Sequence, residues 1–359
     1  TTNYKIDIVL DEIKKELNGQ LILTYTNHSP DTLHYIYFHL YPNAFKNYQT
    51  AFSKQLLANL RTDYWFSREH QKGWIDGLNF KVNQKDAGFQ INDTFIDMGK
   101  LILNEPLLPN QMIEITSPFH VKLPYCFSRL GYSDSNFQIT QWYPKPAVYD
   151  RDGWHPMPYL DQGEFYGEFG NYLVNITAKS NYSIASTGNL IEKKVYSNYT
   201  TSTFEEKNIH DFAWFASPQF ISIRDSFQID GKSKTAEIFY PNDLSEYSPW
   251  KDANQYLKRA TSYYSKHIGN YPFQKVAAVK GDIMAGDGME YPTITIVTDD
   301  SYDELFDEII THEVGHNWFY SMLGSNERKY TWMDEGMNSL YELKYMSEYY
   351  GNHVHEFSR

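Results

Sequence analysis

The sequence has almost no cysteine, since Cys126 is the only one among 359 residues. An intrachain disulfide needs two thiols and a cysteine-based metal cluster needs several, so neither can form within these residues. A single thiol also leaves open whether the protein works in an oxidising or a reducing compartment. Any metal site must therefore use histidine and carboxylate side chains.

Long apolar runs and an excess of basic residues are missing as well. No stretch of about eighteen apolar residues occurs, so no transmembrane segment is predicted. The sequence that starts at residues 1–3 does not show the basic and then apolar pattern of a signal segment. The compartment is not predicted, although we favour an extracytoplasmic one, with the signal removed, over the cytoplasm. The formal net charge of −13 disfavours nucleic acid as a partner.

Aromatic residues, in contrast, are abundant, with 31 Tyr, 22 Phe and 8 Trp. Segments that alternate apolar and polar residues, such as Tyr4 to Leu10, recur over roughly the first two hundred residues and favour strands. Longer helical patterns come only later, at Trp250 to Ile268 and from about residue 303. The sequence thus predicts a multidomain α+β protein with a β-rich first part.

The segment Thr311 to Tyr320, THEVGHNWFY, carries the clearest chemical signal. His312 and His316 are four residues apart, so on a helix both imidazoles project from one face and can chelate one metal ion. Glu313 can reach a water on that metal, which is the general-base position of the HExxH zinc motif. We expect residues 299–301 to cap this helix.

A third ligand is predicted at Glu335, which follows His316 by 335 − 316 = 19 positions. A second, antiparallel helix that begins there could present the carboxylate to the same ion. Two histidines, one carboxylate and an open fourth position describe a catalytic zinc site, whereas a structural site would be closed and usually rich in cysteine. The alternative is that the two histidines are solvated or core residues of an amphipathic helix and bind no metal. In that case the position of Glu335, 19 residues after His316, would be a coincidence.

With these residues the chain resembles the aminopeptidase N-like zinc metallopeptidases, gluzincins that combine HExxH with a downstream glutamate. The resemblance extends to Gly288-Met289-Glu290, similar to the family's GxMEN motif, and to Gln141, similar to its amino-terminus-binding glutamine. It implies one zinc ion, a peptide substrate and aminopeptidase activity. It also implies a saddle-like β domain over residues 1–210 and part of a thermolysin-like catalytic domain over residues 211–359.

The resemblance also implies roles for single residues. Glu290, together with Gln141, would bind the free α-ammonium of a peptide, and Gly288 and Met289 would contact the substrate. A fixed anion at Glu290 would place the first peptide bond over the metal, so that the enzyme would cleave only after the first residue of a peptide. Asp287 stands where the family has the first glycine of this motif and Tyr291 where it has asparagine, so neither the family's substrate-edge geometry nor its residue preference is carried over.

The family's transition-state tyrosine lies tens of residues beyond the third ligand, whereas this sequence continues for 359 − 335 = 24 residues after Glu335. Tyr341, Tyr345, Tyr349 and Tyr350 are too close to replace it, and we expect them to be ordinary residues of a helix face. From this departure we expect a fragment of low activity, because losing one oxyanion donor typically lowers the rate by about 10²–10³.

Two other functions remain compatible with the sequence. One is a zinc endopeptidase, or another hydrolase of this group, in which Glu290 does not select free amino termini. The other is a non-catalytic peptide-binding protein on the same scaffold. Cleavage of amino-blocked peptides would favour the first, and binding without hydrolysis would favour the second. The oligomeric state is not predicted.

Overall fold

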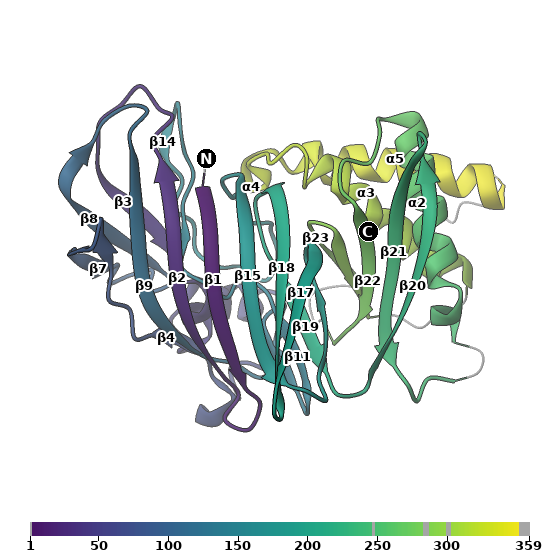
Figure 1. The fold of residues 1–359 in the computed structure, drawn as a ribbon, viewed down its shortest axis with the longest axis horizontal. Helices are drawn as coiled ribbons and strands as arrows, with labels where there is room; N and C mark the ends of the chain where they lie inside the picture. Colours follow the sequence, from purple (N-terminus) through teal and green to yellow (C-terminus); the bar gives the residue numbers. More distant parts are fainter. Residues whose placement is uncertain (1, 246–247, 283–286, 299–302, 352–359) are drawn as a thin grey trace.

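The computed structural model describes residues 2–245, 248–282, 287–298 and 303–351. It has a mixed α+β fold, which confirms the predicted class. A strand-rich part and a helical part lie side by side along the long axis of the molecule (Figure 1). The helix caps expected at residues 299–301 lie outside the described residues.

The strand-rich part is built on a nine-stranded sheet with β1 near its centre. β1 pairs in parallel with β15 and antiparallel with β2. Its side chains alternate between buried and exposed from Tyr4 to Leu10, which confirms the period-two pattern. In spatial order the strands are β17 (Asn189–Tyr196), β18 (Tyr199–Ile209), β15 (Gly170–Lys179), β1 (Thr2–Asp11), β2 (Glu16–Thr26), β9 (Met112–Lys122), β5 (Lys81–Val82) and β6 (Lys85–Asp86), with β4 (Trp74–Asp76) paired to β9.

Three smaller sheets and three short helices complete this part. The sheets are β10 (Gly131–Ser133), β11 (Asn136–Ile139), β19 (Trp214–Ser217) and β16 (Ser183–Ser186); β12 (Lys145–Pro146), β3 (Leu33–His39), β8 (Met98–Leu107) and β7 (Phe89–Ile91); and β13 (Tyr149–Asp150) with β14 (Gly153–Trp154). The helices are η1 (Tyr41–Phe45), α1 (Ala51–Ala58) and η2 (Glu69–Gln71). Because β19 pairs with β11 and β16, the hydrogen bonding of this part continues past residue 210, and the predicted domain boundary there stays a prediction.

The helical part contains a five-stranded sheet covered by helices. Its strands, in spatial order, are β20 (Phe220–Ile229), β21 (Lys232–Pro241), β22 (Lys275–Lys280), β24 (Ile294–Val297) and β23 (Gly288–Tyr291). The helices are η3 (Pro249–Lys251), α2 (Ala253–His267), α3 (Asp303–Phe319), α4 (Glu327–Tyr330), η4 (Thr331–Met333) and α5 (Glu335–Tyr350). β23 ends the strand order and packs beside α3, so the Gly288–Tyr291 segment forms a sheet edge next to the HExxH helix.

A buried acidic residue ties the three long helices together. Asp307 of α3 forms an ion pair with Arg259 of α2, with 2.5 Å between Nη2 and Oδ2. The hydroxyls of Tyr345 and Tyr350, both from α5, donate to the same carboxylate at 2.9 Å. Burial raises the pKa of Asp307, and the Arg259 charge opposes this rise. Two of the four tyrosines after Glu335 therefore serve the packing of the helices.

The glycine inside HEVGH lets α5 approach α3 closely. A Cβ atom at Gly315 would lie 1.9 Å from Oδ1 of Asn338 and 2.4 Å from the hydroxyl of Tyr264, so no larger residue fits. Asn338 also donates from Nδ2 to the carbonyl of His312 at 2.7 Å. This contact fixes α5, and with it Glu335, against the turn of α3 that carries the histidines.

Arg328 joins the two parts of the molecule. It lies on α4, just before the segment that leads to Glu335, and reaches into the strand-rich part. Its Nε donates to the carbonyl of Glu164 at 3.1 Å, and its Nη1 donates to the carbonyl of Pro158 at 2.5 Å. The strand-rich part therefore helps to position the segment that presents the third predicted ligand.

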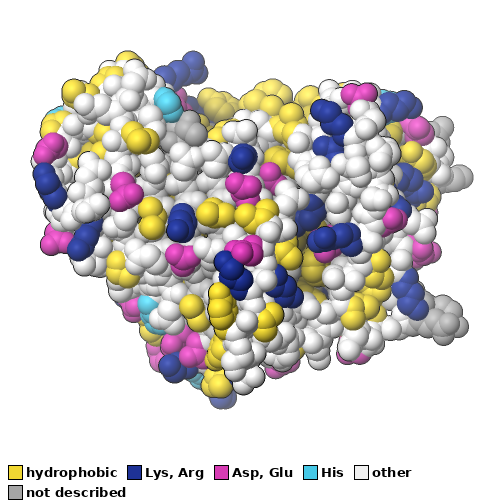
Figure 2. All heavy atoms as spheres, viewed as in Figure 1, with side chains coloured by type: hydrophobic (Ala, Val, Ile, Leu, Met, Phe, Trp, Pro, Cys, Tyr) yellow, Lys and Arg dark blue, Asp and Glu magenta, His cyan; other side chains and the backbone are white. Residues whose placement is uncertain are grey.

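Charges of both signs are interspersed on the face shown in Figure 2, so the acidic excess is not gathered there. Among the described residues, no helix combines the length and the apolar character needed to cross a membrane.

Candidate metal centre

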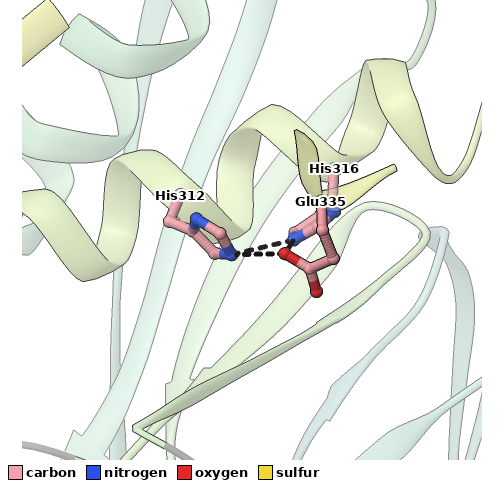
Figure 3. A group of neighbouring side chains, drawn as sticks. All are labelled: His312, His316 and Glu335. Carbon is pink, nitrogen blue, oxygen red and sulfur yellow. Dashed lines mark hydrogen bonds and ion pairs between the residues drawn. The ribbon is translucent and has the colours of Figure 1, made fainter. Parts of the chain in front are cut away.

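Three side chains from two helices converge on one point. Nε2 of His312 and Nε2 of His316 lie 3.1 Å apart. Oε2 of Glu335, the first residue of α5, lies 3.4 Å from Nε2 of His312 and 4.0 Å from Nε2 of His316. Figure 3 shows the two rings projecting from α3 and the carboxylate turned towards them. The structure thus brings together the three residues that the spacing predicts as ligands.

A buried carboxylate lies behind each imidazole. Nδ1 of His312 is 2.6 Å from Oε2 of Glu342, and Nδ1 of His316 is 2.5 Å from Oδ1 of Asp334. A carboxylate accepts a hydrogen bond from the nitrogen that it faces, which assigns the ring proton to Nδ1 and leaves the lone pair of Nε2 pointing at the centre. The Nε2 lone pairs of the two rings then face one another and repel, and a cation between them would remove this repulsion.

The directions in which the surroundings shift the pKa values of the two histidines agree with this geometry. Burial lowers the pKa of His312, but hydrogen bonds to Glu335 and Glu342 outweigh it, and the pKa lies well above the ordinary value. Burial also lowers the pKa of His316, and the charge and hydrogen bond of Asp334 outweigh it in the same way. Both rings therefore attract a positive charge to Nε2, either a proton or a metal ion.

The distances fit zinc. With zinc–nitrogen bonds of about 2.0–2.1 Å, two neighbouring ligand atoms of a tetrahedral site are roughly 3.3 Å apart. Two of the three separations here, 3.1 and 3.4 Å, match this edge, and the third, 4.0 Å, is somewhat longer. Neutral imidazoles and one carboxylate are also ligands that zinc prefers. The residues present thus fit one zinc ion with one position left for substrate.

Glu313 projects towards the same centre, and Gly288 leaves room for it. An ion could bridge ligand atoms of Glu313, His316 and Glu290, since these atoms all lie within 4.8 Å of one another. A Cβ atom at Gly288 would lie only 2.3 Å from Oε1 of Glu313. The glycine of the edge strand β23 therefore sets the position of the predicted general base.

Replacing Gly288 with Ala is expected to displace the Glu313 carboxylate and leave the fold intact, because the clash involves the end of a flexible side chain. A misplaced base typically lowers kcat by about 10². Peptidase assays and thermal unfolding check this. Gly88→Ala is the matched control, since its new methyl group would meet its nearest neighbour, Ile102, at 3.9 Å. Equal activity of both variants would contradict the placement of Glu313.

A cavity of about 480 Å³ opens beside the metal centre, and Glu290 and Met289 of β23 line it. Glu290 is 6% exposed, and its Oε1 has no hydrogen-bond partner among the described residues. Burial, together with the charges of Glu164, Asp334 and Glu313, raises the pKa of Glu290 well above its usual range. A cationic group that entered the cavity would stabilise the ionised carboxylate.

The structure places Gln141 elsewhere. It is 2% exposed, and its Nε2 donates to Oδ2 of Asp211. Its backbone is in the left-handed region, with φ of 53°. The described residues that line the cavity do not include Gln141. Its role in binding an amino terminus therefore has no support from its contacts.

Sequence reasoning missed four residues around the centre. Glu342 and Asp334 hold the histidines, and Arg129 and Glu164 line the cavity. Glu342 could have been found, because it lies seven positions after Glu335 and so on the same face of α5. Arg129 and Glu164 belong to distant segments of the strand-rich part, and no local pattern links them to the motif.

Replacing Glu342 with Gln is expected to weaken zinc binding by about 10–100-fold, because the amide cannot supply the charge that orients the His312 ring. Competition with a chelator of known affinity measures the change. Glu348→Gln is the control, because Glu348 is an exposed acid on the same helix. Unchanged zinc affinity in the Glu342 variant would mean that this carboxylate does not support the metal.

Neither protein-family models nor the sequences of curated proteins gave a match to this chain. Solved structures did. An M1 zinc metallopeptidase from Deinococcus radiodurans is 13% identical, with a TM-score of 0.64 over 98% of this chain and 70% of that chain. A two-domain M1 zinc metallopeptidase variant bound to L-tryptophan is 13% identical, with a TM-score of 0.67 over 98% and 72%. A Deinococcus radiodurans variant bound to a Tyr-Ser-Ala substrate is 13% identical, with a TM-score of 0.65 over 98% and 70%.

At this identity the likeness establishes the fold. The strand-rich, multi-sheet α+β arrangement of this chain matches that of the two-domain M1 zinc metallopeptidases. The bound tryptophan and tripeptide belong to those proteins.

Proposed function

We propose that this protein is a zinc-dependent aminopeptidase that removes residues from the amino end of peptides. The observation that carries the proposal is the convergence of His312, His316 and Glu335 within 4.8 Å of one another, beside a cavity that contains the buried carboxylate of Glu290. The fold shared with M1 zinc metallopeptidases supports it. We further propose that the protein binds a single zinc ion, that its two domains meet at residue 210, and that it is located outside the cytoplasm.

The chain's own residues divide the chemistry among them. His312, His316 and Glu335 would hold zinc, which polarises a scissile carbonyl and makes water more acidic. Glu313 is the general base that takes the proton of the attacking water and passes it to the leaving amine. Asp334 and Glu342 keep the imidazoles oriented through Nδ1.

Glu290 is the candidate group for the substrate's amino terminus. An ammonium group beside it would form a charge-assisted hydrogen bond to a buried carboxylate whose Oε1 has no partner among the described residues. Holding the terminus at this point orients the first peptide bond towards the metal centre. The edge of β23, with Gly288 and Met289, is available to align the extended peptide.

The test compares one peptide with a free and with an acetylated amino terminus, on zinc-loaded protein. Acetylation removes the positive charge, so cleavage of the acetylated peptide is expected to fall by about 10²-fold or more if a buried carboxylate recognises the charge. Equal cleavage would favour the zinc endopeptidase, in which Glu290 does not select. Binding of both peptides without hydrolysis at full zinc occupancy would favour the non-catalytic peptide-binding protein.

A further inference from the structure

One wall of the cavity has no part in the proposed mechanism. It is formed by Arg129, Gln162 and Glu164 from the strand-rich part, with Asp287 at the start of the edge strand. If Glu290 holds the α-ammonium and the carbonyl faces the metal centre, two substituents of the substrate's first Cα are fixed. The third substituent, the side chain of the first residue, can then face the wall that contains Arg129, Gln162 and Glu164.

Glu164 is held firmly in that wall. Its two carboxylate oxygens accept from Nη1 and Nη2 of Arg129 at 2.5 and 2.6 Å. The Arg129 side chain is 3% exposed and that of Glu164 is 14% exposed, so the pair is largely buried. A carboxylate has about four acceptor positions, and the guanidinium takes one on each oxygen. Glu164 can therefore accept further hydrogen bonds from a group in the cavity, with Arg129 as its positioning residue.

The charges of the wall are unbalanced. Among the described residues that line the cavity, five are carboxylates, namely Glu164, Asp287, Glu290, Glu313 and Glu335, and Arg129 alone is a basic residue that is positive at every working pH. Zinc and the α-ammonium would compensate those at the reaction centre. The positive charge of Arg129 balances the negative charge of Glu164. Among the described residues of the wall, no further basic residue then balances the charge of the exposed Asp287.

Building on the proposed aminopeptidase function, we propose that this cavity selects peptides whose first residue has a cationic side chain, lysine or arginine. Glu164 and Asp287 are the carboxylates that recognise the side-chain charge. The backbone of Asp287 is fixed, because its carbonyl accepts from the backbone nitrogen of Thr298 at 2.9 Å and from its hydroxyl at 3.0 Å. The Glu164 carboxylate is thus positioned before a substrate binds, whereas Asp287 is fixed through its backbone and its exposed side chain can turn towards the substrate.

The experiment compares the p-nitroanilides of lysine and norleucine, which differ at the end of the side chain by an ammonium group against a methyl group. On the zinc-loaded wild-type protein, kcat/KM is expected to be about 10–100-fold higher for lysine, the range for a hydrogen bond to a charged group. Equal or faster cleavage of the norleucine compound overturns the inference and leaves the aminopeptidase standing. Turnover of neither compound counts against the proposed function.

A binding measurement decides the inference even without turnover. Calorimetry with lysinamide and norleucinamide on the Glu313→Gln protein is expected to show tighter binding of lysinamide, and equal binding overturns the inference. Glu164→Gln should bring the lysine-to-norleucine ratio towards one, but it leaves the buried Arg129 without its counter-charge and can impair folding. Asp287→Asn avoids this problem, because Asp287 is exposed, and should lower the ratio by a smaller factor. An unchanged ratio in both folded variants also overturns the assignment.

Discussion

Replacing Glu313 with Gln is expected to lower kcat by about 10²–10⁴, the range for removing a general base, with zinc still bound. Glutamine fills nearly the same space but cannot take a proton. His312, His316 and Glu335 are untouched, so metal content should stay at one ion per chain. Steady-state peptidase assays measure kcat, and metal analysis of the same protein sample measures the zinc content.

The matched control is Glu304→Gln, which changes an acid in the first turn of the same helix, α3. This variant should retain wild-type kcat and zinc content. If Glu313→Gln kept full activity at full zinc occupancy, another group would have to be the base. If it lost zinc together with activity, Glu313 would belong to the ligand set, as the closeness of Glu290, Glu313 and His316 allows.

The metal-binding part of the site was predictable because a helix fixes its geometry locally. The spacing of four positions from His312 to His316 places both rings on one face of α3, and the structure has their Nε2 atoms 3.1 Å apart. To predict Glu335 as the third ligand, we needed only one further assumption, namely that a second helix runs antiparallel to the first. The alternation in β1 was equally readable, because a strand that is buried on one face imposes a period of two.

The cavity wall was not predictable, because its residues come from segments that are far apart in the sequence. β1 pairs in parallel with β15, and no local pattern encodes this contact between Thr2 and Gly170. Arg129 and Glu164 lie in irregular segments outside the strands and are 35 positions apart, yet both line the cavity. As two residues among 32 basic and 45 acidic ones, they carry no distinguishing spacing. The contact of Gln141 with Asp211, seventy positions further along the chain, was likewise not readable from the sequence, and the role of Gln141 in binding an amino terminus stays a prediction.

Removing zinc is expected to abolish activity and to lower the melting temperature. A ligand at about 1,000 times its dissociation constant stabilises a protein by about 4 kcal/mol, which corresponds to a shift of roughly 5–10 °C for a chain of this size. Chelation followed by thermal unfolding measures the shift, and added zinc should restore both properties. Zinc should act in this way because it would be held by His312 and His316 on α3 together with Glu335 on α5.

The size of this shift should grow with pH. In the metal-free protein the pKa values of His312 and His316 lie above the ordinary value, because Glu335, Glu342 and Asp334 outweigh burial. Protonation of these rings thus stabilises the metal-free fold below the unfolded pKa of about 6.5, and this contribution is lost as pH rises through the raised values. Protons and zinc compete for Nε2, so zinc affinity rises over the same interval. Melting curves with and without zinc, from about pH 5.5 to about pH 8, should therefore diverge as pH increases. A constant or shrinking difference would mean that zinc does not bind through these two imidazoles.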